Sequence, residues 1–425
     1  MSSGKLKWPS RLEGGYAASL AYSDFRYMLG ASFFAGAASW ALIVARGLLV
    51  YHLTDSALLV GLVTFAAMIP RVLVTPFTGY LSDRFDRRSV LVAMYGVNFV
   101  QNLLLALLVL TGHVEIWLIA VMSLLDGSAR AAQMPASQAL IPNLIPRPLL
   151  LNGIALNQAA GHGSRLFGPA AIAPLLGLGD APAAFFLASG LYAVSFLLST
   201  RMRTPSTGRI DQRQGLVRNL LEGLAYVYRT PVLLSVMLLA LFHCGLTMSF
   251  ESLLPVISSQ RLDAEGAGFS YLMMSVGAGA LVSVLLLATV RNEATKGRLF
   301  LNLGVLSGVT PGLLAMSGNM PLAMLSAAGM GAAHAGFMTL THTMIQAITP
   351  DHVRGRVGAV YSVHIGGMMA TANLVNGGLA DAVNASMLLL VAGAAFVVVM
   401  LLSWQRVTLR RIFISGLRAE PVAAD

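Results

Sequence analysis

Long apolar stretches, separated by short polar segments, run through almost the whole chain. A helix that crosses a bilayer needs about 20 mostly apolar residues. By this measure the pattern predicts twelve membrane-spanning helices: 28–52, 57–80, 89–111, 115–139, 152–176, 182–200, 231–256, 267–290, 298–317, 320–346, 356–380 and 385–405. Several of these stretches are rich in Gly and Ala, which membrane helices use for close packing. We therefore expect an all-α, polytopic membrane protein.

The amino-acid composition also indicates a membrane protein rather than a soluble one. Of the 425 residues, 56% are hydrophobic and only 11% are charged, whereas a soluble domain is about one quarter charged. A soluble core cannot bury so much apolar surface, so lipid must solvate it. The single cysteine, Cys244, lies in an apolar run, which excludes an intrachain disulfide and predicts a packed, apolar side chain.

The positive charge is concentrated on one side of the predicted membrane. The chain carries a formal charge of +10, and nearly all of its Lys and Arg residues fall in the termini and in alternate loops. Arg261 is the one basic residue expected in the loops of the opposite side. Basic residues flanking membrane helices mark the cytoplasmic side. We therefore expect both termini to be cytoplasmic, and we interpret the charge as a topology signal rather than a nucleic-acid-binding surface.

The longest polar stretch divides the predicted spans into two sets of six. It covers residues 201–230, which we expect to be a basic cytoplasmic linker between an N-terminal bundle, 1–200, and a C-terminal bundle, 231–425. Residues 215–229 look amphipathic, which is typical of a helix that lies in the membrane surface.

The loop after the second predicted span, "GYLSDRFDRRSVL", resembles the loop between helices 2 and 3 of the major facilitator superfamily. The residues that fit the pattern include Gly79, Asp83, Arg84, Asp86, Arg87 and Arg88. The resemblance implies a secondary transporter built from two pseudo-symmetric six-helix bundles, in which this loop gates the outward-facing state. Asp83 would cap a neighbouring helix N-terminus. Arg354 and Arg356 would serve the second half in the same way; the alternative is that these charges only set topology.

Four further sequence segments resemble those of the efflux branch of that superfamily, which includes the bacterial enterobactin exporter. They are "PASQALIPNLIP" (135–146), "NQAAGHGSRLFGPA" (157–170), "TPDHVRGRVGAVYSV" (349–363) and "GGLAD" (377–381). One departure stands out: the antiporter pattern Gly-Pro-x-x-Gly-Gly is replaced by Gly168-Pro169 followed by "AAIAP". The resemblance implies export driven by the proton gradient, with no cofactor and no metal.

Ionisable residues inside the predicted spans are the candidates for function, because each costs roughly 2.5–3.5 kcal/mol to place at mid-bilayer. Asp126 lies about 16 Å into its span, at 1.5 Å per residue, and is the first candidate for proton coupling. Arg130 lies at i+4, a spacing that lets the two side chains meet. The pair could switch with protonation or be a static tie; the remaining alternative is that Asp126 lies at a lipid edge or that the span is misplaced. Arg165, also near the midplane, could instead pair with Asp126 as a gate or as a structural tie.

The remaining candidates have weaker support from the sequence. Glu251 could bind a proton or a cationic group, or be a solvated residue at a cavity mouth. Arg46 and Arg71 could attract an anionic substrate, although Arg46 could also extend to the outer interface. His243 and His334 could relay protons or simply pack, and no histidine spacing fits a metal site.

The function that fits best is proton-coupled export of a siderophore or drug-like compound across a bacterial inner membrane. We expect a monomer whose partners are its small-molecule substrate and the lipid bilayer, with no nucleic acid. An importer or facilitator of a metabolite or iron chelate is the alternative within the same class. A non-transporting sensor or scaffold, and a membrane enzyme, are alternatives from other classes. An enzyme is disfavoured because no His, Asp or Cys cluster lies at a helix end. ATP-driven transport is not supported, because a nucleotide-binding GxxxxGK[ST] loop is absent.

Overall fold

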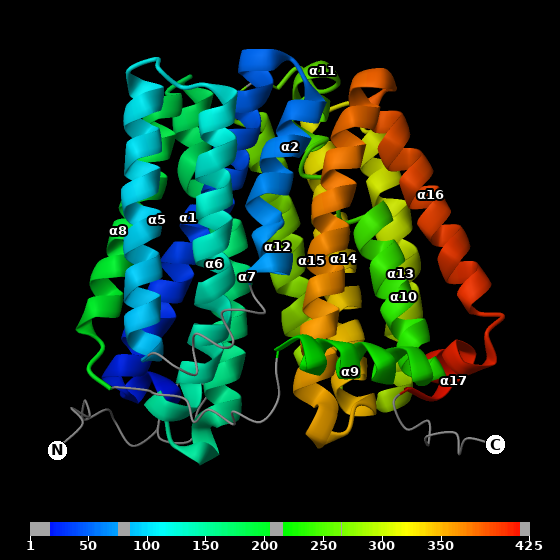
Figure 1. Ribbon diagram of the computed structural model, residues 1–425. Coiled ribbons are helices and arrows are strands. Elements are labelled where there is room, and N and C mark those ends of the chain that lie inside the picture. Colours follow the sequence, from blue (N-terminus) through cyan, green and yellow to red (C-terminus); the bar gives the residue numbers. More distant parts are fainter. Residues whose placement is uncertain (1–17, 75–85, 205–215, 265, 417–425) are drawn as a thin grey trace.

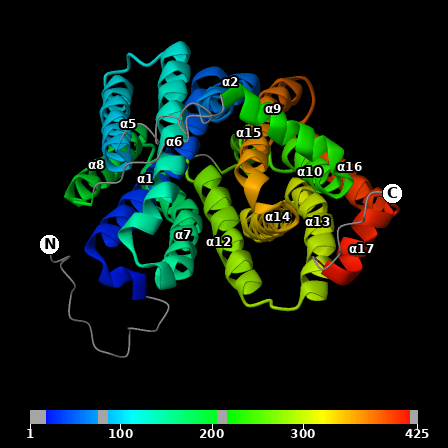
Figure 2. The ribbon, with the colours of Figure 1, turned by 60° about the horizontal axis from the view of Figure 1, so that its bottom comes forward.

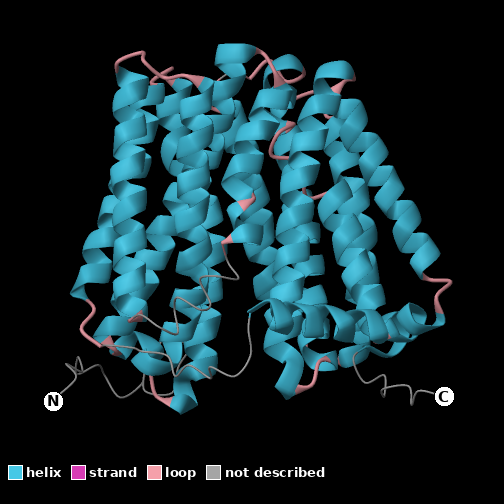
Figure 3. Ribbon diagram, viewed as in Figure 1, coloured by secondary structure: helices cyan, strands magenta, loops and turns pink. Residues whose placement is uncertain are grey.

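A computed structural model describes residues 18–74, 86–204, 216–264 and 266–416. The described residues form helices joined by short turns, with no strand among them (Figure 3). The helices stand side by side in two groups (Figure 1). The first group contains α1 (Ser23–Thr54), α2 (Ala57–Met68) with α3 (Pro70–Leu73), α5 (Arg87–Leu110), α6 (Ile116–Leu144), α7 (Leu150–Gly177) and α8 (Ala181–Arg201).

The second group repeats this arrangement. It contains α10 (Pro231–Leu246) with α11 (Leu254–Gln260), α12 (Gly268–Ala288), α13 (Glu293–Met316), α14 (Met320–Ile348), α15 (Asp351–Ala382) and α16 (Ala385–Ser403). Two helices lie across one end of the molecule: α9 (Leu216–Arg229) and α17 (Val407–Ser415) (Figure 1). We call this the basic end, because exposed arginines such as Arg229, Arg406 and Arg410 lie there. The end at which α11 lies is called the opposite end.

The predicted all-α fold of twelve spans in two bundles is confirmed, but two of the spans are not single continuous helices. Span seven was expected at 231–256, yet α10 ends at Leu246 and α11 begins only at Leu254. The intervening residues are rich in Ser and Thr, and Ser249 Oγ donates to the Cys244 carbonyl over 2.7 Å. Such side chains compete with the backbone for helical hydrogen bonds. In span two, α2 ends at Met68 and α3 begins at Pro70. The break lies there because Pro70 has no backbone N–H to donate a helical hydrogen bond.

A strict test of helix length, hydropathy and charge identifies only half of these spans among the described residues. Six described helices pass as membrane-crossing by length and composition: α1, α5, α8, α12, α13 and α16. A seventh would be counted if α9 and α10 formed one span, but they meet at a bend of 105°. Helices α6, α7, α14 and α15 are 28–32 residues long. Their sequences contain polar side chains such as Asp126, His334 and Asn373, which the bundle buries.

Polar residues in the turns begin many of the helices. Asp180 Oδ1 accepts a hydrogen bond from the Ala183 amide at the start of α8, over 2.9 Å. The same N-cap arrangement is provided by Ser56 for α2, Asp86 for α5, Asn292 for α13, Asn319 for α14 and Asn384 for α16. These side chains satisfy backbone amides that have no partner within the helix, and they fix where each span starts.

The two halves meet along two helix pairs, α2 with α15 and α7 with α12. Small residues allow the close approach. A Cβ on Gly377 would overlap with the Ala57 carbonyl oxygen, and a Cβ on Gly277 would lie 2.8 Å from the Arg165 carbonyl carbon. The largest apolar cluster extends across this junction and joins Tyr51 of α1 with Phe269 of α12.

Helix α9 occupies most of the segment expected to be amphipathic. Val227 on this helix is buried, whereas Leu221 and Tyr228 are exposed. Glu222 forms an ion pair with Arg356 of α15, with 2.7 Å between Oε2 and Nη1, and this contact ties α9 to the second half. The predicted domain limits at 200 and 231 stay a prediction, because residues 205–215 lie outside the described part of the chain.

Candidate functional site

The first half buries an ion pair inside its helix bundle. Asp126 Oδ2 on α6 lies 3.6 Å from Arg46 Nη1 on α1, and both side chains are almost fully buried. Three neutral groups donate to Asp126 Oδ1: Gln101 Nε2 at 3.2 Å, Asn102 Nδ2 at 3.3 Å and the Tyr192 hydroxyl at 3.2 Å. Arg46 Nη2 also donates to Asn102 Oδ1 over 2.7 Å. Helices α1, α5, α6 and α8 thus meet at one carboxylate.

The pairing of Asp126 differs from the sequence prediction. Neither Arg130 nor Arg165 forms an ion pair with Asp126 among the described residues, and the carboxylate contacts Arg46 instead. The alternative that Arg46 extends to the outer interface is also wrong, because only 4% of it is exposed. Spacing along one helix identifies neighbours on that helix alone. Here the donors come from three other helices, which spacing cannot reveal.

Unpaired polar atoms surround this network. Arg46 Nε, Gln101 Oε1, Ser123 Oγ and both amide atoms of Asn98 are buried without a hydrogen-bond partner. Buried polar groups are ordinarily paired with protein or with ordered water. A set of unpaired atoms around a carboxylate is therefore a chemically suitable place for water and for proton movement.

Arg165 lies at the junction of the two halves. Its guanidinium carbon sits 4.4 Å from the centre of the Trp40 ring, a cation–π geometry between α7 and α1. Its backbone packs against Gly277 of α12, in the other half. Glu251 is close enough for a Coulombic interaction with Arg165, but no ion pair joins them among the described residues. Arg165 therefore contacts both halves.

Glu251 lies in the break between α10 and α11. It is only 2% exposed, so the interpretation of Glu251 as a solvated residue at a cavity mouth is wrong. Asn373 Nδ2 of α15 donates to Glu251 Oε2 over 3.0 Å, while Asn373 Oδ1 accepts from the Ser252 amide over 3.3 Å. A single amide side chain thus holds both the carboxyl group and the non-helical backbone beside it.

The two predicted histidines are packed together in the second half. The rings of His243 on α10 and His334 on α14 meet edge to face, with centroids 5.1 Å apart, and both are buried. Phe337 and Phe396 pack against the His243 ring at 4.6 Å and 5.2 Å. His334 Nε2 lies 3.3 Å from the Ser307 carbonyl oxygen, and both ring nitrogens of His243 lack a partner. The surroundings favour packing, and the relay role stays a prediction.

Arg71 remains exposed although its helix lies between the halves. Its Nη2 is 3.8 Å from Met134 Sδ of α6, and a Cβ on Gly366 of α15 would lie 3.3 Å from the Arg71 Cβ. The half-buried Arg130 lies within Coulombic range of it. Two arginines with no acidic partner among the described residues thus occupy one region between α3 and α6.

A stacked pair of rings in the second half lies near this region. Tyr361 of α15 is within Coulombic range of Arg71, and its ring stacks on His342 of α14 at a centroid distance of 5.6 Å. His342 is exposed and Tyr361 is half-buried. The arrangement can offer cationic and aromatic contacts to one ligand.

The loop between the second and third spans, residues 79–91, is only partly described. Gly79, Asp83 and Arg84 lie outside the described residues. Asp86 Oδ2 accepts from the Ser89 amide and hydroxyl at the start of α5, and its neighbours Arg87 and Arg88 donate to carbonyl groups of α6 and α8. In the second half, Arg354 donates to the Thr349 carbonyl over 3.2 Å, and Arg356 pairs with α9. Their gating role stays a prediction.

Asp381 forms an inter-half contact that the sequence prediction did not include. It accepts hydrogen bonds from Ser56 Oγ and the Ala57 amide, both at 2.6 Å, and from the Leu58 amide at 3.0 Å. A carboxylate of α15 thereby caps the N-terminus of α2 in the other half. A sequence signal existed: "GGLAD" (377–381) has the same G-x-L-x-D spacing as "GYLSD" (79–83).

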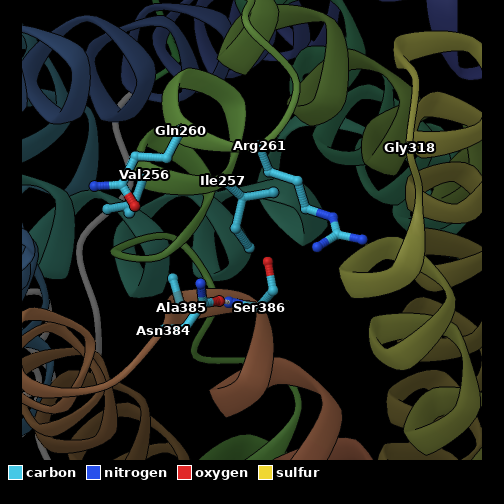
Figure 4. A pocket seen from close by; sticks show the side chains of 8 residues that line it. All are labelled: Val256, Ile257, Gln260, Arg261, Gly318, Asn384, Ala385 and Ser386. Carbon is cyan, nitrogen blue, oxygen red and sulfur yellow. Dashed lines mark hydrogen bonds between the residues drawn. The ribbon is translucent and has the colours of Figure 1, made fainter.

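A pocket of about 430 Å³ lies at the opposite end, away from the buried charges. It is lined by residues of α11, of the turn before α14 and of the start of α16, including Gln260, Arg261 and Ser386 (Figure 4). Arg261 Nε donates to the Ser317 carbonyl over 3.0 Å. Within the described residues, no group of three or more His, Cys, Asp or Glu side chains is placed to hold a metal ion.

The family match decides the class of protein. A family model described as "Transmembrane secretion effector" matches residues 14–414, which is nearly the whole chain. The chain belongs to this family. It is therefore a multi-pass membrane transporter of the major facilitator superfamily, as its two-bundle fold indicates.

Relatives of this transporter include efflux proteins. The multidrug efflux pump Tap of Mycolicibacterium fortuitum is 26% identical over 348 residues, which cover 78% of this chain and 83% of Tap. The staphyloferrin A transporter of Staphylococcus aureus is 21% identical over 62% of this chain and 67% of its own length. The solved nucleoside transporter NupG has a TM-score of 0.71 at 12% identity, covering 89% of this chain and 98% of NupG, and shows the shared fold.

Several contacts of this transporter involve residues that the sequence prediction overlooked. Gln101, Asn102 and Tyr192 surround Asp126, and Asn373 holds Glu251. The sequence did contain a signal for the Asn and Gln residues, namely side-chain amides within apolar spans. A buried amide needs hydrogen-bond partners, so each one indicates a polar contact inside the bundle. A search limited to charged residues misses these neutral polar side chains.

Proposed function

We propose that this transporter exports a small molecule from a bacterial cell in exchange for protons. The family match and the similarity to a multidrug efflux pump, a macrolide efflux protein and a siderophore transporter support this. The transporter would act as a monomer and would need no cofactor, since the proton gradient supplies the energy.

The basic end would face the cytoplasm. Arg201, Arg298, Arg354 and Arg410 belong to the excess of basic residues at that end, and such an excess marks the cytoplasmic side of a membrane protein. The membrane would be the bacterial inner membrane, with both termini in the cytoplasm. The 430 Å³ pocket would then open toward the periplasm.

The described contacts between the halves hold the opposite end closed. Hydrogen bonds between described residues of the two halves occur at three places: Asp381 with the start of α2, Gln260 with Tyr51, and Asn373 with Met68. The first two are at the opposite end. Rocking of the two bundles about a midplane site would break these contacts and expose the substrate to the periplasm.

The Asp126–Arg46 pair is the observation that carries the coupling proposal. The carboxylate is buried, is not charge-matched by any other described residue, and is held by neutral donors that could also contact its protonated form. Protonation would cancel the ion pair and leave Arg46 with Asn102 as its hydrogen-bonding partner. Helices α1 and α6 would then be free to move relative to each other. Glu251 is the second candidate proton site, because it lies at a helix break that contacts α15.

Arg71 and Arg130 would bind the substrate through an anionic group. Arg71 lies beside α15, Arg130 is within Coulombic range of Arg71, and Tyr361, whose ring stacks on His342, is also within that range. Carboxylate or catecholate siderophores carry both negative charge and flat groups that could use these contacts. A cationic drug would be repelled by the same pair of arginines.

The test is transport in inverted membrane vesicles, with lumenal pH recorded as candidate substrates are added. The panel contains carboxylate and catecholate siderophores and lipophilic cationic drugs. Substrate-dependent release of protons from acidified vesicles is the expected result for the wild-type protein. Substrate accumulation with no pH response would instead identify a uniporter, and uptake only in the opposite orientation would identify an importer.

Coupling is assigned by comparing variants. Asp126→Asn should abolish gradient-driven accumulation while substrate exchange in the absence of a gradient is retained. Asp180→Asn, which changes a carboxylate at a helix cap of the same half, is the matched control and should behave as wild type. If Asp126→Asn keeps full gradient-driven transport and Glu251→Gln loses it, the coupling site is Glu251.

A further inference from the structure

An apolar groove runs along the outside of the second half, near the basic end. It has a volume of about 540 Å³ and lies between α13 and α16. Leu301, Val305 and Leu306 form one wall, while Leu401 and Trp404 form the other. Leu306 and Leu401 are about half exposed, at 46% and 59%. Helices α13 and α16, which form the groove, lie on the side of the second half away from the first half (Figure 2).

Helix α17 packs against α13 at the basic end (Figure 1) and begins three residues after Trp404, so its start lies beside the groove, at what we call the groove's mouth. The Trp404 ring, which lines the groove, stacks nearly parallel to Phe413 of α17 at a centroid distance of 5.9 Å. Phe413 and Leu409 are buried, so one face of α17 is fixed to the bundle. Its position beside α13 is set by Gly297, where a Cβ would overlap with the Ile412 carbonyl oxygen.

The exposed face of α17 is strongly basic. Arg406, Arg410 and Arg411 are all exposed, and Arg406 and Arg410 lie one helical turn apart, two and six residues after Trp404. No ion pair or side-chain hydrogen bond involves these three guanidinium groups among the described residues. The nearby Glu293 of α13 is paired with Lys296 over 2.8 Å.

We propose that this groove, with the arginines at its mouth, binds an anionic glycerophospholipid of the leaflet at the basic end. One acyl chain would lie against Leu301, Val305 and Leu401, and the phosphate would contact Arg406 and Arg410. Trp404 would lie at the level of the lipid headgroups, as interfacial tryptophans do. Unpaired basic groups beside an apolar groove match the chemistry of a lipid with a negative headgroup.

This site is separate from the transport residues. The groove and α17 contact neither Asp126 nor Arg71, and the proposal does not depend on proton coupling or on substrate identity. Bound lipid would brace α16 and α17 against α13 and so stabilise the second half. The expected signal is therefore a lipid-dependent rise in melting temperature.

The test uses the full-length protein purified in detergent and titrated with dioleoyl phosphatidylglycerol or dioleoyl phosphatidylcholine. Melting temperature and lipid retention in native mass spectrometry are recorded. The anionic lipid should stabilise the wild-type protein more, and Arg406→Gln/Arg410→Gln should weaken its binding by at least about fivefold. Arg201→Gln/Arg203→Gln, which removes two exposed charges from the basic end of the first half, is the matched control and should leave binding unchanged.

A second variant tests the groove itself. Val305→Trp fills the groove and leaves the arginines intact, so it should weaken binding of the dioleoyl lipid while short-chain dihexanoyl phosphatidylglycerol is unaffected. Melting without lipid shows whether each variant is folded. Equal stabilisation by both headgroups, an unchanged affinity in the double Arg variant, or the same stabilisation by inorganic phosphate alone would overturn the proposal.

Discussion

Asp381 of α15 and Ser56 of α2 join the two halves of the transporter, with 2.6 Å between the carboxylate and the hydroxyl oxygen. The same carboxylate accepts from the Ala57 and Leu58 amides. Helix N-terminal amides have no partner within their helix, and a negative charge there is favourable. The contact therefore stabilises the arrangement in which the opposite end is closed.

Removing this cap should favour opening. Asp381→Ala should cost the closed arrangement about 1–2 kcal/mol, or roughly a 5- to 30-fold shift in population. Because Cys244 is the single native cysteine and is buried, a Cys244→Ser background is suitable for labelling. The probe is Ala267→Cys, because Ala267 is buried and its Cβ would lie 3.4 Å from a Cβ added to Gly177 of the other half. Its reaction with a membrane-impermeant maleimide should become faster.

The control for this experiment is Asp180→Ala. That residue also caps a helix, but within the first half, so its loss should leave the labelling rate unchanged. Equal rates in the Asp381→Ala and parent proteins would show that the Asp381 contact does not hold the halves together.

The Asp126–Arg46 pair should be strongly coupled energetically. Removing one member of a buried ion pair leaves an uncompensated charge and typically costs about 3–5 kcal/mol, so Asp126→Ala and Arg46→Gln should each lower the melting temperature. The Arg46→Gln/Asp126→Ala double variant should be more stable than the sum of the two single effects predicts. Glu293→Gln, which breaks a less buried pair with Lys296, should cost no more than about 1 kcal/mol.

Gly277 should be required for packing between α7 and α12. A Cβ there would lie 2.8 Å from backbone atoms of Arg165 and Leu166, and backbone cannot move aside as a flexible side chain can. Gly277→Ala should therefore destabilise the protein by about 1–3 kcal/mol. Gly190→Ala is the matched control, because open space surrounds that position and alanine favours the helix by about 1 kcal/mol. Thermal melting in detergent distinguishes the two.

Arg71 should determine which substrates bind. Arg71→Gln should weaken transport of anionic compounds and leave that of neutral ones nearly unchanged, because it removes one positive charge from an exposed position between the halves. Arg71→Lys keeps the charge and should retain part of the activity. Competition assays in vesicles measure the effect; equal loss for anionic and neutral compounds would instead assign Arg71 a structural role.

Much of the fold could be predicted from the sequence because lipid imposes strict local rules. A helix in a bilayer must satisfy its own backbone hydrogen bonds and present apolar side chains outward. Apolar stretches therefore located the spans, and the distribution of Lys and Arg predicted which loops share a side. Breaks within a span could not be predicted in this way. The break after Leu246 comes from Ser and Thr side chains and from Pro255, and a hydropathy profile does not detect their effect on helical hydrogen bonds.

The sequence by itself thus determined the number of spans, the family and which residues carry charge inside the bundle. Only the tertiary structure decided the partners: Arg46 for Asp126, Asn373 for Glu251, and the start of α2 for Asp381. The reason is physical. Hydropathy and i, i+4 spacing describe one helix at a time, whereas these contacts depend on which helices pack together, and that depends on close approaches such as Gly377 against Ala57.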